Sequence, residues 1–157
     1  MTPITVHQRS RRHGELLRTL PHAAAAPILL DLPPGAGREA AATEISAALG
    51  APLLRVSLTD VVSEYIGETE KNLSRLFERA SEAGAVVYVD EADALFGKRT
   101  GVRDAHDRYA NIDASWLLER LRTARCRVIV GARARRQAVR DADAMLAAVV
   151  RAPRRHP

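Results

Sequence analysis

The sequence predicts an α/β fold in three layers, with a five-stranded, mostly parallel sheet covered by helices on both faces. Two observations predict it. Short apolar stretches alternate with segments that carry apolar residues at helical spacing. The stretch at residues 85–89, Ala-Val-Val-Tyr-Val, is apolar at every position, which is typical of a central strand buried on both sides. Strands that alternate with helices in this way favour a parallel sheet.

The expected strands cover residues 27–32, 52–58, 85–89, 127–131 and 149–151. The expected helices cover residues 15–20, 38–49, 69–80 and 111–123. Gly50 and Gly84 stand where two of these helices should end, because glycine readily takes the left-handed conformation of a helix C-terminus. Thr69 is expected to cap the N-terminus of the third helix. We expect one core domain at residues 25–157, preceded by a lead-in with a short helix at residues 1–24.

The composition narrows the class of protein. A chain of 157 residues suits one domain with a sizeable core, and 46% hydrophobic with 27% charged residues is ordinary for a globular protein. No apolar run approaches the roughly 20 residues needed to cross a bilayer. The single cysteine, Cys126, cannot form an internal disulfide, so we expect a cytoplasmic protein. The net charge of +5 invites a nucleic-acid partner, but an aromatic content of 4% leaves little surface for stacking bases and disfavours one.

Three acidic residues follow the most apolar strand. Asp90 and Glu91 come directly after residues 85–89, and Asp93 lies close behind. Ligands of parallel sheets bind beyond the carboxyl ends of the strands, and charge placed there is costly unless a cation meets it. A helix N-cap is the alternative, but it accounts for one acid and not for three. The pattern favours a Mg²⁺ ligand at Asp90 and, at Glu91, a base that polarises an attacking water.

The loop at residues 32–39, Leu-Pro-Pro-Gly-Ala-Gly-Arg-Glu, joins a strand to a helix, where a phosphate-binding loop belongs. It matches the pattern G-x-x-x-x-G-K-[ST] poorly. Gly37 is kept, whereas Leu32 replaces the first glycine. Arg38 stands at the lysine position, and Glu39 stands at the position of the magnesium-binding hydroxyl. By itself the loop is typical of a tight strand-to-helix turn.

Three stretches together resemble the AAA+ ATPases, a family of P-loop NTPases, in order and in spacing. They are Pro-Pro-Gly-Ala-Gly at residues 33–37, Ser-Glu-Tyr-Ile-Gly-Glu-Thr-Glu-Lys-Asn-Leu at residues 63–73, and Asp-Glu-Ala-Asp-Ala-Leu-Phe-Gly-Lys-Arg at residues 90–99. A fourth stretch, at residues 104–111, is similar to one found in a bacterial branch of that family. The resemblance covers about residues 25–153.

This resemblance implies ATP and Mg²⁺ as cofactors, with Asp90 as the metal ligand and Glu91 as the catalytic base. The implied nucleotide-binding residues are Pro34, Gly35, Ala36, Gly37, Arg38 and Glu39. Tyr65, Ile66 and Gly67 match the pore loop that grips a polypeptide in hexameric members, and residues 98–105 match a second pore loop. Without the flanking motif, Tyr65 would be read as a surface aromatic on a turn. The implied partners are a polypeptide substrate and AAA+ subunits in a homo- or hetero-hexamer, with no membrane.

Several positions depart from the family pattern. The planar guanidinium of Arg38 is wider than the lysine ammonium that fits between phosphates. Glu39 places an anion beside the phosphates, which at about 4 Å and an effective dielectric near 20 repels by roughly 4 kcal/mol. Arg133 stands at the polar sensor, and the positions of the arginine fingers hold Ala144 and Met145. The resemblance ends where the family's helical lid would begin, so we expect no lid in this sequence.

Three functions remain open from the sequence. The first is an ATP-binding domain of a protein-remodelling family whose hydrolysis is weak or lost, acting as a passive or regulatory subunit. The second is an active ATPase or unfoldase subunit that uses Glu91. The third is a nucleotide-free module that binds other proteins through the loop of Tyr65 and its helix surfaces.

Overall fold

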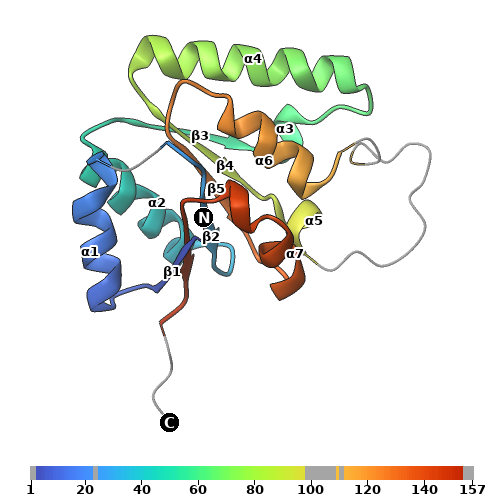
Figure 1. The fold of residues 1–157 in the computed structure, drawn as a ribbon. Helices are drawn as coiled ribbons and strands as arrows, with labels where there is room; N and C mark the ends of the chain where they lie inside the picture. Colours follow the sequence, from blue (N-terminus) through green and yellow to red (C-terminus); the bar gives the residue numbers. More distant parts are fainter. Residues whose placement is uncertain (1–2, 23–24, 98–108, 110–111, 154–157) are drawn as a thin grey trace.

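The structure is a computed structural model that describes residues 3–22, 25–97, 109 and 112–153. Its strands form one sheet with the order β1-β6-β2-β5-β4-β3 (Figure 1). The strands are β1 (Ile4–His7), β2 (Ile28–Asp31), β3 (Leu53–Ser57), β4 (Val86–Asp90), β5 (Val128–Ala132) and β6 (Ala148–Arg151). Every neighbouring pair is parallel. The predicted parallel α/β sheet is confirmed, but it holds six strands and not five.

The additional strand, β1, comes from the segment expected to be a lead-in. It lies at the edge of the sheet and pairs with β6, with Ile4 opposite Ala148. Val6 is its one buried hydrophobic side chain, at 1% exposure, whereas Ile4 is 57% exposed. A four-residue strand with one buried apolar residue has too short a pattern to be distinguished from a loop in the sequence.

The helices cover both faces of the sheet, as predicted. They are α1 (Arg11–Thr19), α2 (Ala36–Leu49), α3 (Leu58–Val61), α4 (Ile66–Ala83), α5 (Asp93–Phe96), α6 (Ala114–Arg122) and α7 (Arg136–Asp141), with 3₁₀ turns at Leu20–His22 and Asp143–Met145. Helices α1 and α2 lie on one face of the sheet, and helices α4 and α6 lie on the other (Figure 1). The apolar side chains of each pair form a hydrophobic cluster with the sheet. Within the described ranges, no helix is long and apolar enough to span a bilayer.

Strand β4 lies in the interior of the sheet and is buried at all five positions. Val87 and Val89 face the cluster of α4 and α6, whereas Val86 and Tyr88 face the cluster of α1 and α2. The apolar run therefore marked a strand buried on both faces, as expected. It carries Asp90 to the carboxyl edge of the sheet.

The predicted helix ends agree with the structure at two glycines. Gly50 and Gly84 follow α2 and α4 with φ values of 64° and 61°, in the left-handed region. The prediction that Thr69 caps a helix was wrong. Helix α4 begins three residues earlier, at Ile66, and Thr69 lies buried in its first turn. Its hydroxyl accepts a hydrogen bond from the Ser63 backbone N–H at 2.9 Å, which secures the loop before α4.

Candidate functional site

The loop between β2 and α2 lies exposed at the carboxyl edge of the sheet. Gly35 has a φ of 119°, a conformation that a residue with a Cβ rarely adopts, and it lets the chain turn directly into α2. Residues 33–37 are all exposed. The free backbone amides at the start of α2 carry a partial positive charge, which favours an anion such as phosphate. This part of the predicted nucleotide loop is therefore open to a ligand.

Arg38 points the opposite way, into the protein. Its side chain is completely buried, although it follows five exposed residues. Its Nη1 lies 3.0 Å from Asp90 Oδ1, and its Nη2 lies 3.3 Å from Asp93 Oδ1. Nε and Nη2 also donate to the Leu32 carbonyl oxygen at 3.1 and 2.6 Å. The residue at the lysine position thus binds the acidic residues of the site.

Both partners of this buried ion pair stay charged. Burial alone lowers the pKa of Arg38, but hydrogen bonds and charges of Asp93 and Asp90 more than offset it, so the pKa is raised. Burial alone raises the pKa of Asp90, but the Glu91 backbone N–H and the Arg38 guanidinium hydrogen-bond the carboxylate and bring its pKa below the usual value. The pair is therefore ionised across the physiological range.

Gly131 of β5 provides the space for this arrangement. A Cβ at this position would lie 2.6 Å from Asp90 Oδ1, 2.8 Å from Arg38 Cδ and 2.9 Å from the Tyr88 hydroxyl. No side chain fits at such distances without moving its neighbours. Because these groups come from α2 and β4, the glycine of β5 is what lets them close around the buried guanidinium.

A second arginine, Arg55 of β3, completes the cluster. Its Nε lies 2.6 Å from Glu39 Oε1, and its Nη2 lies 2.9 Å from Asp90 Oδ2. A hydrogen bond to Glu39 is the main cause of its raised pKa. Both oxygens of Asp90 thus accept from a guanidinium: Oδ1 from Arg38 and Oδ2 from Arg55. We call these four residues with Asp93 the ion-pair network.

Sequence reasoning missed Arg55. The expectation for Glu39 was an unpaired anion facing phosphate, but its carboxylate pairs with Arg55. The available signal was a single charged residue inside an otherwise apolar strand. Its partners could not be read from the sequence, because Glu39 and Asp90 reach it from a helix and from a neighbouring strand.

Asp93 does not cap a helix, which was the alternative to a functional acid. The N-cap of α5 is Ala92, and Asp93 is the first helical residue. Its Oδ1 accepts from the Arg133 backbone N–H at 2.8 Å. Arg133, at the expected sensor position, therefore contributes its backbone to the network.

Glu91 lies outside the network and is exposed. Its φ of 60° is in the left-handed region, which costs a residue with a side chain about 1 kcal/mol or more. The Ser57 hydroxyl, at the end of β3, donates to Glu91 Oε2 at 2.6 Å. The carboxylate is thus held at the sheet edge with access to solvent.

The residues of the site fit a phosphate better than they fit Mg²⁺. Magnesium takes oxygen ligands in near-octahedral geometry. The two carboxylates placed for it, Asp90 and Glu39, are already occupied by arginine N–H groups. Over the part of the chain that the structure describes, no group of three or more His, Cys, Asp or Glu side chains could hold a metal ion. A metal bridging Asp90 and Glu39 would have to displace the Arg55 guanidinium.

Two predicted loops stand apart from the network. Tyr65 and Ile66, just before and at the start of α4, are 64% and 40% exposed, unusual for large hydrophobic residues. With Gly67 they form an apolar tip that is free to contact another molecule. Residues 98–105, expected to be a second such loop, lie outside the described residues.

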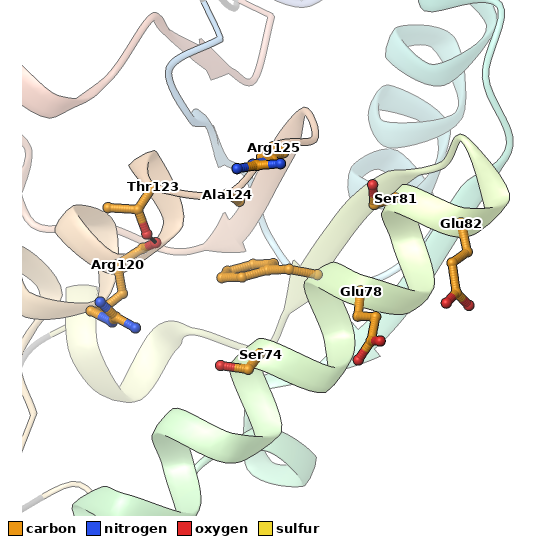
Figure 2. Close-up of a pocket in the computed structure, with 9 residues that line it drawn as sticks. Ser74, Glu78, Ser81, Glu82, Arg120, Thr123, Ala124 and Arg125 are labelled. Atoms are coloured by element: carbon orange, nitrogen blue, oxygen red, sulfur yellow. Dashed lines mark hydrogen bonds between the residues drawn. The ribbon is translucent and has the colours of Figure 1, made fainter.

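Cavities also lie outside the network. One of about 900 Å³ is lined by residues 5–12 and Pro153. Its wall contacts the phosphate loop, because Gln8 Nε2 donates to the Gly37 carbonyl oxygen at 3.1 Å. Another, of about 410 Å³, is a groove between α4 and the end of α6, with Arg120 and Arg125 across from Ser74 and Glu78 (Figure 2).

A comparison with known families identifies the family of this chain. The model of the "ATPase family associated with various cellular activities (AAA)" matches residues 28–154. The chain belongs to the AAA family. The predicted AAA+ membership, with its P-loop NTPase fold, is thereby confirmed. Nucleotide binding, usually with Mg²⁺, is the family's general property.

Curated AAA relatives match parts of the chain. It is 38% identical over 89 residues to the "Nuclear valosin-containing protein-like" of Mus musculus. The matched segment covers 56% of this chain and 10% of the relative. It is 42% identical over 72 residues to the protein "SUPPRESSOR OF K(+) TRANSPORT GROWTH DEFECT 1" of Arabidopsis thaliana, a match that covers 45% of this chain and 17% of the relative. The "Cell division cycle protein 48 homolog" of Archaeoglobus fulgidus is 32% identical over 98 residues, a match that covers 62% of this chain and 13% of the relative.

This AAA chain therefore spans less than a fifth of the length of each of these relatives. They come from an animal, a plant and an archaeon, so membership of a bacterial branch stays a prediction. The individual roles predicted for residues 34–39, Asp90, Glu91 and the loop of Tyr65 stay predictions as well.

Proposed function

We propose that this AAA domain binds a nucleotide without hydrolysing it and serves as a non-catalytic subunit beside a catalytic homologue. The observation that carries the proposal is the buried ion pair between Arg38 and Asp90. In the family pattern, the residue at the position of Arg38 neutralises phosphate charge, and the residue at the position of Asp90 binds the metal. Here each neutralises the other.

Loss of hydrolysis follows from what phosphoryl transfer requires. Catalysis of this reaction rests on positioning and on cations that neutralise the charge of the transferred group. Arg38 donates to Asp90, Asp93 and a backbone carbonyl, so its guanidinium is directed away from the exposed loop. An arginine finger is worth roughly three to five decades of rate, and the expected positions of the fingers hold Ala144 and Met145.

Binding of a nucleotide is supported by what the site keeps. Residues 33–37 are exposed at the start of α2, where backbone amides favour phosphate. The cavity lined by residues 5–12 and Pro153 adjoins this loop and is large enough for a nucleoside. We place the phosphates at the loop and the base toward this cavity.

The proposed partners are a polypeptide and further AAA subunits. The exposed side chains of Tyr65 and Ile66 support contact with a polypeptide, since large apolar residues at a surface loop mark interaction sites. A hexamer with an intact AAA homologue would let the domain fill a position in the ring while its neighbours hydrolyse ATP.

An active ATPase is the second candidate, favoured by one observation. Glu91 is exposed and held by the Ser57 hydroxyl, as a base needs to be. This candidate requires a nucleotide to rearrange the ion-pair network. The third candidate is the nucleotide-free interaction module. It is favoured by the charge balance of the ion-pair network, in which two arginines pair with three carboxylates and leave a net charge of one.

Nucleotide binding and phosphate release together separate the three. We expect ATP to bind, measured by calorimetry and by a rise in the unfolding temperature, and no phosphate release above the buffer rate. Release that disappears in Glu91→Gln would establish the active ATPase. Absence of binding at millimolar ATP would establish the nucleotide-free module.

A further inference from the structure

We propose that the Arg55 guanidinium takes the place of the metal ion, so that this site binds the phosphates of a nucleoside di- or triphosphate free of Mg²⁺. The inference deepens the proposed function, because it names the cation and the form of the ligand at the same site. It starts from the misfit between the site's donors and a magnesium ion.

Arg55 bridges the two positions that the sequence motif assigns to the metal. Glu39 stands where the motif has the magnesium-binding hydroxyl, and Asp90 stands where it has the metal-binding acid. The guanidinium contacts both, at 2.6 Å to Glu39 Oε1 and at 2.9 Å to Asp90 Oδ2. A fixed positive charge thus lies between them, and the anionic Glu39 is explained as its partner.

The two arginines of the network have different functions. Arg38 is completely buried and holds Asp90 from below the loop. Arg55 has a side chain that is 44% exposed. Its hydrogen bonds use Nε and Nη2, and within the described part of the chain Nη1 makes none. A guanidinium has five N–H donors in a planar fork that suits phosphate oxygens, so Arg55 can bind a phosphate while it holds Asp90.

Glu39 is the internal competitor for this cation. Its side chain is 42% exposed and its carboxylate contacts Arg55 from the solvent side of Asp90, which is 7% exposed. An incoming phosphate is an anion of the same kind and would compete for the Nε donor. The affinity of the site for phosphate therefore depends on how readily phosphate replaces the Glu39 carboxylate at Arg55.

The experiment measures the dissociation constants of ATP and ADP by calorimetry, once with EDTA and once with millimolar Mg²⁺. For the unmodified chain we expect binding with EDTA and a weaker apparent affinity with Mg²⁺, because the ion binds the phosphates and withdraws free nucleotide. Arg55→Gln should weaken binding by roughly 10- to 100-fold, the loss of a hydrogen bond to a charged group. Glu39→Gln should strengthen binding on the order of tenfold, because it removes the competing charge.

Matched variants exclude general charge effects. Arg79→Gln and Glu82→Gln, on the exposed side of α4, make the same charge changes away from the site and should leave both dissociation constants unchanged. Arg55→Lys keeps the charge but not the fork, and should lie between the unmodified chain and Arg55→Gln. Circular dichroism and urea unfolding check that each variant is folded.

A reversal variant tests the exchange of cations directly. Arg38→Lys combined with Glu39→Thr and Arg55→Val restores the lysine and the hydroxyl of the motif and removes the substitute cation, so its binding should become dependent on Mg²⁺. If the unmodified chain needs Mg²⁺ to bind, the inference is overturned while binding without hydrolysis stands. If Arg55→Gln binds as well as the unmodified chain, Arg55 is not the cation. If no nucleotide binds in either buffer, the proposed function fails and the inference fails with it.

Discussion

Arg38 Nη1 lies 3.0 Å from Asp90 Oδ1, and 0% and 7% of the two side chains are exposed to solvent. A buried pair of this kind is costly to break from one side, because the remaining charge is left without water or a partner. The first three predictions concern this pair and the groups that enclose it.

Replacing Arg38 by methionine should lower the free energy of unfolding by up to about 3–5 kcal/mol, since Asp90 Oδ1 loses its buried cation and the carboxylate keeps only the partly exposed Arg55. Urea unfolding followed by circular dichroism measures the change. The double variant Arg38→Met with Asp90→Asn removes both charges and should recover part of the loss. A single variant as stable as the unmodified chain would show that the pair carries no net stabilisation.

Gly131→Ala should be destabilising by about 1–3 kcal/mol, because its Cβ would overlap the Asp90 carboxylate and Arg38 Cδ. Gly67→Ala is the matched control: its Cβ would meet nothing within 4 Å, and Gly67 lies in the first turn of α4. The control should keep or slightly raise the unfolding temperature. Equal effects of the two substitutions would mean that the space at Gly131 is not required.

Tyr88 should make the fold sensitive to alkali. Burial, followed by the charge of Asp90, raises the pKa of its hydroxyl in the folded protein. The unfolded chain releases this proton near pH 10, so the contribution of Tyr88 is fully present below that pH and is lost as the pH rises above it, by at most about 1.4 kcal/mol per pH unit. Tyr88→Phe should flatten the decline in unfolding free energy between pH 9.5 and 11. An unchanged decline would assign it to other groups.

Asp113 should stabilise α6 from its N-terminus. Its Oδ1 accepts from the Trp116 backbone N–H at 2.7 Å, as the N-cap of the helix. Asp113→Ala should lower the free energy of unfolding by about 1 kcal/mol. Glu78→Ala, at an exposed position within α4, removes the same charge without removing a cap and should change it by less than about 0.5 kcal/mol. The comparison fails if both variants lose the same amount.

The parts of this AAA domain that sequence reasoning predicted are those determined by local pattern. The five apolar strands, the helices α1, α2, α4 and α6 and the glycines after α2 and α4 each carry their signal within about ten residues. The short helices α3, α5 and α7 were not among the expected helices. Asp90 was expected at the carboxyl edge of the sheet for the same reason: it follows β4 directly. Strand β1 was missed because only Val6 among its four residues is a buried hydrophobic.

The site was predicted less well, because its chemistry depends on contacts between distant segments. Arg38, Glu39 and Asp90 lie together at the carboxyl edge of the sheet, as their places after β2 and β4 indicated, but their contacts with one another and with Arg55 were not predicted. Arg55 lies 16 residues from Glu39 and 35 from Asp90 in the sequence. No local pattern shows that one guanidinium will contact both carboxylates. The substitution of a carboxylate for a hydroxyl at residue 39 has a physical reason only once Arg55 is beside it.

The pairing of the first strand with the last has a consequence for how the protein is made. His7 and Ala152, at the ends of β1 and β6, are joined by a hydrogen bond across 145 residues of chain. A ribosome adding roughly 5 to 20 residues per second needs about 7 to 30 s to synthesise that length. Strand β1 therefore waits without its neighbour until β6 has been made, and the sheet must be completed at this edge after its centre has formed.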